Sequence, residues 1–235
     1  MARALAVGLG EPALFTDGGS GRAARLAAEV GGEALAANAE LARADLVILA
    51  HKPAQLEAVA REIGQARLVL SLLGGVPVAA VESAYPGARV VRAMPNTAVE
   101  VRRGVTCICG ADVPAVAELL ARVGSVVRLA ERLMDAATAV SGVAPAYVAL
   151  IAEAWIDAAV GQGIPAAQAA ELVADSLAGS AALLLARHMD TLGVRRAVTS
   201  PGGMTARGLR ALEQAGVRAA FADAAAAVVG SGPAK

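Results

Sequence analysis

The stretch Leu46-Val47-Ile48-Leu49-Ala50 indicates the fold class, because it is an unbroken apolar run of strand length. Such runs are typical of strands that are buried on both faces of a parallel sheet. Pro53 follows closely and favours the start of a helix over residues 54–63. Leu68-Val69-Leu70-Ser71-Leu72 then repeats the apolar run. The sequence therefore predicts a strand, a helix and a second buried strand.

The same alternation continues on both sides of this unit. Before it, we predict a strand at residues 13–16 and a helix at residues 22–30. After it come strands at residues 90–94, 105–109 and 125–129, and a helix at residues 113–122. Repeated strand–helix units imply a parallel sheet with helices on both faces, an α/β fold. Ligands of such sheets bind outside the carboxyl ends of the strands, here at residues 17–20, 50–53, 72–75 and 94–97.

The second half of the chain is predicted to be helical. After about Glu131 the strand pattern stops, and helices are expected at residues 134–162, 165–188, 205–214 and 217–229. The first should kink near Pro145, because proline removes a hydrogen bond inside a helix. The second carries a large apolar surface that includes Leu172, Leu177 and Leu183, and we expect another copy of the chain to cover it. Residues 230–235 are expected to form a disordered tail.

Composition narrows the possible functions. The chain of 235 residues suits one large or two modest domains, and its 21 basic residues balance 21 acidic ones. This balance gives no attraction to nucleic acid or to an anionic membrane surface. No stretch reaches the roughly 18 bulky apolar residues of a membrane span. The N-terminal residues also lack the long apolar core of a signal peptide.

The two cysteines, Cys107 and Cys109, lie two residues apart in an apolar run. Residues so placed on one strand cannot easily bond to each other, and a metal site would need more ligands. We interpret them as core thiols of a cytoplasmic protein that holds no metal.

Residues 198–205, Val-Thr-Ser-Pro-Gly-Gly-Met-Thr, are a candidate ligand site. Pro201 fixes one φ angle, and the two glycines after it allow conformations that other residues avoid. Thr205 precedes an apolar-periodic run and is predicted to cap a helix. Such a turn leaves backbone N–H groups unpaired at the positive end of a helix dipole, which suits a carboxylate. The alternative is a plain connector between two helices.

Three stretches resemble the signatures of pyrroline-5-carboxylate reductases, in matching order and spacing. They are Arg92-Ala93-Met94-Pro95-Asn96-Thr97, Ser141-Gly142-Val143-Ala144-Pro145-Ala146-Tyr147 and residues 198–205. The resemblance covers nearly the whole chain and implies reduction of 1-pyrroline-5-carboxylate to proline with NADP or NAD, in proline biosynthesis. It also implies a Rossmann-type domain over residues 1–130. A helical dimerisation and substrate-binding domain would follow over residues 131–235, in a homodimer or an assembly of dimers.

The resemblance also assigns roles to single residues. Asn38 would lie near the adenosine end of the cofactor. The cofactor-binding candidates together are Ser20, Asn38, Ala50, His51, Lys52, Pro53, Gly74 and Asn96. The substrate-binding candidates are Ser200, Gly203, Met204 and Thr205, with substrate held by backbone N–H groups and the threonine hydroxyl. Thr205 and Glu131 are the candidate catalytic residues.

Each of these residues also has a simpler interpretation. Asn38 could cap the helix that follows it, and Lys52 could be a solvated turn residue. The sole role of Glu131 could be to favour the start of the long helix. His51 lacks neighbouring ligand types and suits a surface or internally bonded histidine. Trp155 lies at helical spacing from other apolar residues, so core packing is the default for it.

One feature of the family is missing from this sequence. Chains of the family open with a strand and a Gly-x-Gly-x-x-Gly turn that cradles the pyrophosphate, and no such turn occurs here. Met1-Ala2-Arg3-Ala4-Leu5-Ala6 resembles the helix that follows that turn. The sequence therefore begins about a dozen residues late, or the protein has lost its first strand. A loss would remove a central strand from the sheet and leave its two neighbouring strands exposed.

Two further questions stay open in the sequence. In Asp17-Gly18-Gly19-Ser20, an acidic residue suits a ribose hydroxyl, whereas Ser20 or Arg22 would serve a 2′-phosphate. The choice between NADP and NAD is therefore not settled. The alternatives to the reductase are a catalytically impaired paralogue that acts as a non-catalytic helical dimer, and a related reductase of another imine or small acid.

Overall fold

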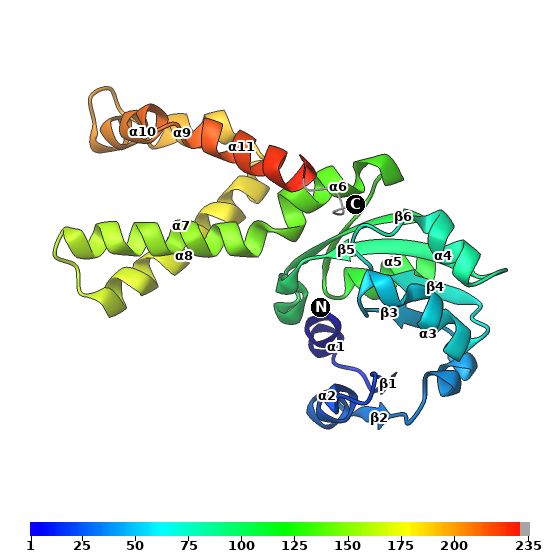
Figure 1. Cartoon of the computed structure of the whole chain (residues 1–235). Coiled ribbons are helices and arrows are strands. Elements are labelled where there is room, and N and C mark those ends of the chain that lie inside the picture. The colour runs from blue at the N-terminus through cyan, green and yellow to red at the C-terminus, as the bar shows by residue number, and fades with distance from the viewer. Residues whose placement is uncertain (231–235) are drawn as a thin grey trace. The chain divides into compact units, whose positions relative to one another are not determined.

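The computed structural model describes residues 1–230 and divides into two compact units (Figure 1). The first unit comprises Met1–Pro145 together with the C-terminal stretch that begins at Ala227. The second comprises Ala146–Ala226. Residues 131–145, which the sequence placed with the helical half, thus belong to the first unit. The predicted tail lies, from residue 231 onward, outside the described residues.

A five-stranded sheet forms the centre of the first unit. Its strand order is β3 (Val47–Leu49), β4 (Leu68–Ser71), β5 (Arg89–Pro95), β6 (Gly104–Gly110) and β7 (Gly124–Arg128). β3, β4 and β5 pair in parallel, with Val69 beside Val47 on one side and Val90 on the other. Val69 and Val90 are completely buried, as their apolar runs predict.

Helices cover both faces of this sheet, as predicted. They are α1 (Ala2–Leu9), α3 (Leu56–Ile63), α4 (Val78–Ala84) and α5 (Pro114–Ala121), whereas α2 (Arg22–Val30) packs on the separate pair of strands described below. One apolar core contains Leu56 and Tyr85, and a second contains Leu5 and Leu120. Two separate cores are the expected result when alternate residues of a strand point to opposite faces.

The sheet is parallel, as predicted, except at one pair of strands. β6 runs antiparallel to β5, with Cys109 opposite Arg92. A parallel crossover needs a dozen or more residues, but only residues 96–103 connect these two strands. The 3-10 helix η3 (Thr97–Val101) and Arg102, which has a φ of 57°, reverse the chain within this short connection.

A second, two-stranded parallel sheet is made by β1 (Ala13–Phe15) and β2 (Gly32–Ala34). Within residues 1–230, β1 pairs only with β2, and β3 pairs only with β4. Ile48, at the centre of β3, is 37% exposed, although its neighbours on the strand are buried. The two strands expected to be left exposed thus do have unpaired edges, and the sheet is divided between them.

The long helix predicted over residues 134–162 is interrupted rather than kinked. It consists of η4 (Glu131–Leu133), α6 (Met134–Ala137), the π-helical η5 (Thr138–Gly142) and α7 (Ala144–Gly161). Pro145 has no N–H to offer the Ser141 carbonyl, and the Asn96 side chain donates to that oxygen instead, at 3.1 Å. The break therefore has the predicted cause and lies just before the proline.

The second unit consists of helices with little interior of their own. α7 is followed by α8 (Ala166–Ala186), α9 (Thr191–Ala197), α10 (Met204–Gln214) and α11 (Val217–Gly230). Among its described residues, only Ala169 and Val173 are buried. The prediction that Trp155 packs in a core is wrong for the single chain, since this residue is 48% exposed. Other large apolar side chains are exposed as well: Leu150, Leu172, Leu185 and Phe221.

Two helical segments of the described chain, Glu131–Gly161 and Ala166–Ala186, are long and apolar enough to cross a membrane by length and composition. The same composition suits helices that are buried against another subunit. Composition alone therefore does not distinguish these two surroundings.

Candidate functional site

A cavity of about 500 Å³ lies at the carboxyl ends of β1 and β2, the edge where open α/β sheets bind ligands. Its lining comprises Asp17, Gly18, Gly19, Ala36, Ala37, Asn38, Ala39 and Glu62. The Asn38 amide donates to Glu62 Oε2 at 2.7 Å. Asn38 is not a helix cap, because the 3-10 helix η1 (Asn38–Arg43) has Ala37 at that position. The structure thus brings Asn38 together with residues of the 17–20 turn at one cavity.

Asp17 turns its carboxylate back towards its own chain. Oδ1 accepts the N–H groups of Gly19 and Ser20, and Oδ2 accepts the N–H of Ala23 at 2.8 Å and the Ser20 hydroxyl at 3.0 Å. These bonds, above all that from Ala23, lower the pKa of Asp17 to about 2. Asp17 therefore stabilises the start of α2 as an anion.

Ser20 and Arg22 are exposed at the same helix start. Arg22 Nε donates to Ser20 Oγ at 2.9 Å, which places a guanidinium beside a hydroxyl. Arg22 is the first residue of α2, where the helix dipole favours an anion. The sequence left two ligands open at this turn, a ribose hydroxyl and a 2′-phosphate. The exposed groups, a hydroxyl and a guanidinium, suit the phosphate.

The two loops predicted to line the cofactor leave neighbouring strands at the same edge of the sheet. Ala50, His51, Lys52 and Pro53 follow β3, and Gly74 follows β4. Lys52 is exposed, and its backbone N–H is held by Gln55 Oε1 at 3.1 Å. A Cβ at Gly74 would meet no atom within 4 Å, so a larger side chain would fit at this position without a steric clash. The glycine leaves its backbone open to solvent instead.

His51 is fixed locally, and its ring does not face a group of ligand residues. Its Nδ1 lies 2.9 Å from the Lys52 carbonyl. Within residues 1–230, no cluster of three or more histidine, cysteine, aspartate or glutamate side chains could hold a metal. Cys107 and Cys109 are free, buried thiols as predicted, and burial raises the pKa of Cys109.

Asn96 was predicted to contact the cofactor, but its amide is committed to the protein interior. Oδ1 accepts the N–H of Val105 at 3.2 Å, and Nδ2 donates to the Ser141 carbonyl. The residue is 6% exposed. Its side chain therefore joins the end of β5 to β6 and to the π turn, and is a structural link. This bond could not be predicted from the sequence. The Ser141 carbonyl is free to accept it only because Pro145, 49 positions from Asn96, has no N–H.

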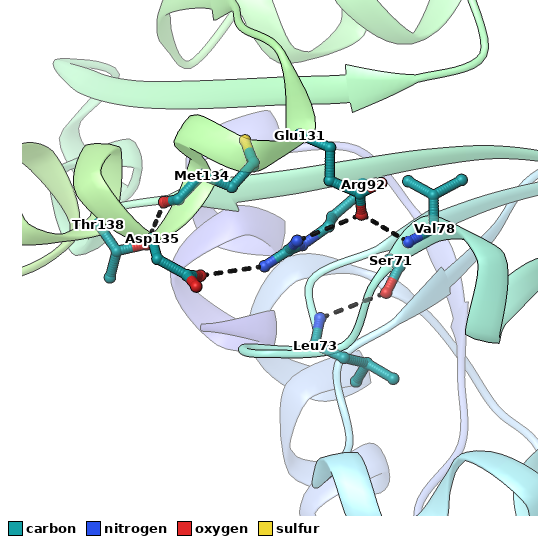
Figure 2. A network of polar contacts seen from close by, with 8 residues as sticks. All are labelled: Ser71, Leu73, Val78, Arg92, Glu131, Met134, Asp135 and Thr138. Atoms are coloured by element: carbon teal, nitrogen blue, oxygen red, sulfur yellow. Dashed lines mark hydrogen bonds and ion pairs between the residues drawn. The ribbon is translucent and has the colours of Figure 1, made fainter. Parts of the chain in front are cut away.

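Glu131 belongs to a polar network at the first unit's sheet, which Figure 2 shows. Its Oε1 accepts the backbone N–H of Val78 at 2.7 Å and lies 3.3 Å from Arg92 Nη1. Arg92 Nη2 lies 3.6 Å from Asp135 Oδ1. Arg92 itself was not among the predicted site residues. A charged residue inside an otherwise apolar strand was the signal that could have found it.

The start of α10 holds the substrate-binding candidates. Gly203 is the cap residue, so the prediction that Thr205 caps this helix is wrong: Thr205 is the second residue of its first turn. Gly202 has a φ of +70°, and a Cβ on Gly203 would collide with the Ser200 side chain. The positive φ of Gly202 favours glycine at that position, whereas Gly203 has an extended conformation that other residues also adopt. The N–H groups of Met204 and Thr205 lie in a first turn, where a helix supplies no acceptor.

Family models match both halves of the chain. The model described as "Pyrroline-5-carboxylate reductase dimerisation" matches residues 131–234. The model described as "NADP oxidoreductase coenzyme F420-dependent" matches residues 1–75. The first match begins at Glu131 and includes the whole Val198–Thr205 stretch.

Curated relatives and solved structures agree with these matches. A pyrroline-5-carboxylate reductase of Thermus thermophilus is 41% identical over 202 residues, which cover 83% of this chain and 77% of the relative. One of Methanosarcina acetivorans is 39% identical, over 80% of this chain and 74% of the relative. The Coxiella burnetii pyrroline-5-carboxylate reductase structure has a TM-score of 0.87 at 30% identity and covers 98% of this chain and 93% of that one. The Plasmodium falciparum pyrroline carboxylate reductase with NADP bound has a TM-score of 0.83 at 27% identity, over 97% and 92%.

Proposed function

Because the chain belongs to the pyrroline-5-carboxylate reductase family, we propose that it reduces 1-pyrroline-5-carboxylate to L-proline with NAD(P)H, in the cytoplasm. The observation that carries this proposal is the start of α10. There, Met204 and Thr205 are exposed and lie in the first turn of a helix, whose backbone N–H groups have no acceptor within the helix. Incubation with 1-pyrroline-5-carboxylate and NADPH should consume one NADPH for each proline formed, and consumption without proline would refute the proposal.

The chemistry of the substrate explains this need for N–H groups. A cyclic imine carboxylate must have its anion anchored, its C=N carbon exposed on one face and a proton on nitrogen. The N–H groups of Met204 and Thr205 anchor the carboxylate in our proposal, and Ser200 and Gly203 shape the turn. The Thr205 hydroxyl faces the imine nitrogen. Because the imine is basic, it arrives protonated and needs no strong general acid, so positioning supplies most of the rate.

The first unit fits a dinucleotide at the carboxyl edge of its strands. The cavity beside Asn38 suits the adenosine end, and the open backbone at Gly74 lets a ligand approach closely. Ala50, His51, Lys52 and Pro53 line the neighbouring loop in our proposal. When bound, NAD(P)H supplies the hydride that reduces the imine.

We expect NADPH to be preferred over NADH, because Asp17 is bonded to its own chain while Ser20 and Arg22 are exposed. Replacing Arg22 with alanine should raise the Kd for NADPH about tenfold and leave that for NADH nearly unchanged, as expected for one charged phosphate contact. Calorimetry with both cofactors measures the two constants. Arg25→Ala, on the same helix, is the matched control. Equal effects on both cofactors would contradict this assignment.

We further propose that the functional protein is a homodimer or an assembly of dimers. The exposed apolar side chains of α7 and α8 and the match to a dimerisation family support this assembly. Sedimentation should show a dimer across the accessible concentration range. A folded monomer whose mass does not change with concentration would contradict this prediction.

A non-catalytic helical dimer is the second candidate function. It is supported by the exposed apolar side chains of α7 and α8, which suit a dimer whether or not a cofactor binds. Dimerisation without proline formation, even after the Gly-rich turn is supplied, would select this alternative.

A further inference from the structure

Arg92 is a buried charge on an interior strand. Its side chain is 5% exposed, and its strand, β5, pairs with a neighbour on each side. A guanidinium in this position is costly unless carboxylates and acceptors surround it. Its Nε and Nη2 atoms have no hydrogen-bond partner, so the contact of Nη1 with Glu131 is its one hydrogen bond among the described residues.

Both carboxylates near Arg92 come from the segment after β7. Glu131 lies in η4 and Asp135 in α6, so the guanidinium ties this segment to the sheet (Figure 2). Glu131 is 39% exposed, whereas Asp135 is 72% exposed and its contact is longer. Screening by water is weaker for the less exposed pair, so Glu131 is the main partner.

Glu131 carries this link on to α4. Its Oε1 accepts the N–H of Val78, the first residue of α4, at 2.7 Å. The cap position of α4 is occupied by Pro77, which supplies no side-chain hydrogen bond. A carboxylate from a distant part of the chain therefore replaces the local cap, and its charge also suits the helix dipole.

The loop between β4 and α4 is held at both of its ends. At its start, the Leu73 N–H lies 3.4 Å from Ser71 Oγ, and Ser71 pairs in register with Arg92. At its end, Val78 is bonded to Glu131. Between these points lie Gly74 and Gly75, both exposed. The position of two flexible residues thus depends on a contact that Arg92 stabilises.

We propose that Arg92 is a positioning residue: acting through Glu131, it holds the N-terminus of α4, and with it the Gly74–Gly75 loop, in place for cofactor binding. The role in cofactor binding rests on the proposed function. In this assignment Glu131 acts on the loop and does not take part in the chemical step.

Amide hydrogen exchange of the full chain tests the structural part without any activity. Glu131→Ala and Arg92→Lys should each raise exchange in the peptide spanning residues 72–80 about tenfold, as expected on loss of a charge-assisted bond. Glu131→Gln keeps an acceptor and should raise it less. Arg89→Lys, an exposed arginine on the same strand, is the matched control and should leave that peptide unchanged. Unchanged exchange in Glu131→Ala would overturn the proposal.

Kinetics separate positioning from catalysis. In a chain preceded by the Gly-rich strand and turn, Arg92→Lys and Glu131→Gln should raise the KM for NADPH about tenfold. Their kcat at saturating NADPH should stay within about twofold, with an unchanged pH profile. A fall in kcat at unchanged KM would make Glu131 catalytic and overturn the proposal. If the extended chain without either substitution forms no proline, the proposed function fails, while the exchange result still decides the role of Arg92.

Discussion

Replacing Thr205 with alanine should lower the rate of proline formation about ten- to a thousandfold, the range for losing one polar contact at a reacting centre. The substitution keeps the backbone N–H but removes the hydroxyl that faces the imine nitrogen in our proposal. The rate is measured at saturating substrate and NADPH, in a chain that carries the Gly-rich strand and turn. The loss should therefore appear mainly in kcat.

The position of Thr205 in α10 makes this experiment cleaner. Since Gly203 and not Thr205 is the cap, the alanine variant should change the free energy of unfolding by less than about 0.5 kcal/mol. Thr205→Ser keeps the hydroxyl and should retain most activity. If both variants keep full activity while folded, the hydroxyl has no catalytic part, and residues 198–205 are a helix connector.

Placing a strand and a Gly-x-Gly-x-x-Gly turn ahead of Met1 should raise NADPH affinity at least about tenfold, or about 1.4 kcal/mol. The pyrophosphate gains backbone donors and the field of a helix N-terminus. The structure gives the added strand a place, because β1 and β3 both have unpaired edges among the described residues. Calorimetry of both chains measures the difference.

An extension of equal length with valines in place of its glycines is the control for this prediction. It can supply a strand, but its side chains block the close approach of a pyrophosphate, so the affinity should stay low. Tight NADPH binding by residues 1–235 without any extension would show that the site does not depend on the Gly-rich turn.

Much of the fold could be predicted because its strands are buried on both faces. The apolar runs at residues 46–50 and 68–72 correspond to β3 and β4, each within two residues. β2 was missed, because Gly32-Glu33-Ala34 is short and lacks β-branched residues. The antiparallel direction of β6 follows from the short connection between β5 and β6. Hydrophobic periodicity predicts that β6 is a strand but not in which direction it runs.

The parts of the candidate site that are formed by backbone turns could be predicted from the sequence. Gly202 has the positive φ that the predicted turn requires, and Asn38 lies beside the 17–20 turn. Side-chain partners far apart in the chain were not predictable. Asn96 bonds to a carbonyl that Pro145 leaves free, and Arg92 meets a carboxylate 39 positions away. Such pairs depend on tertiary packing, which residue types alone do not give.

The most direct test of the central claim, that this chain is a reductase of a cyclic imine carboxylate, uses deuterium. The chain preceded by a Gly-rich strand and turn is incubated with 1-pyrroline-5-carboxylate and NADPH that carries deuterium at the reactive nicotinamide position. Mass spectrometry of the product should show singly deuterated proline, formed in proportion to the NADPH consumed. Proline without deuterium, or no proline from a folded dimer that binds NADPH, would contradict the account.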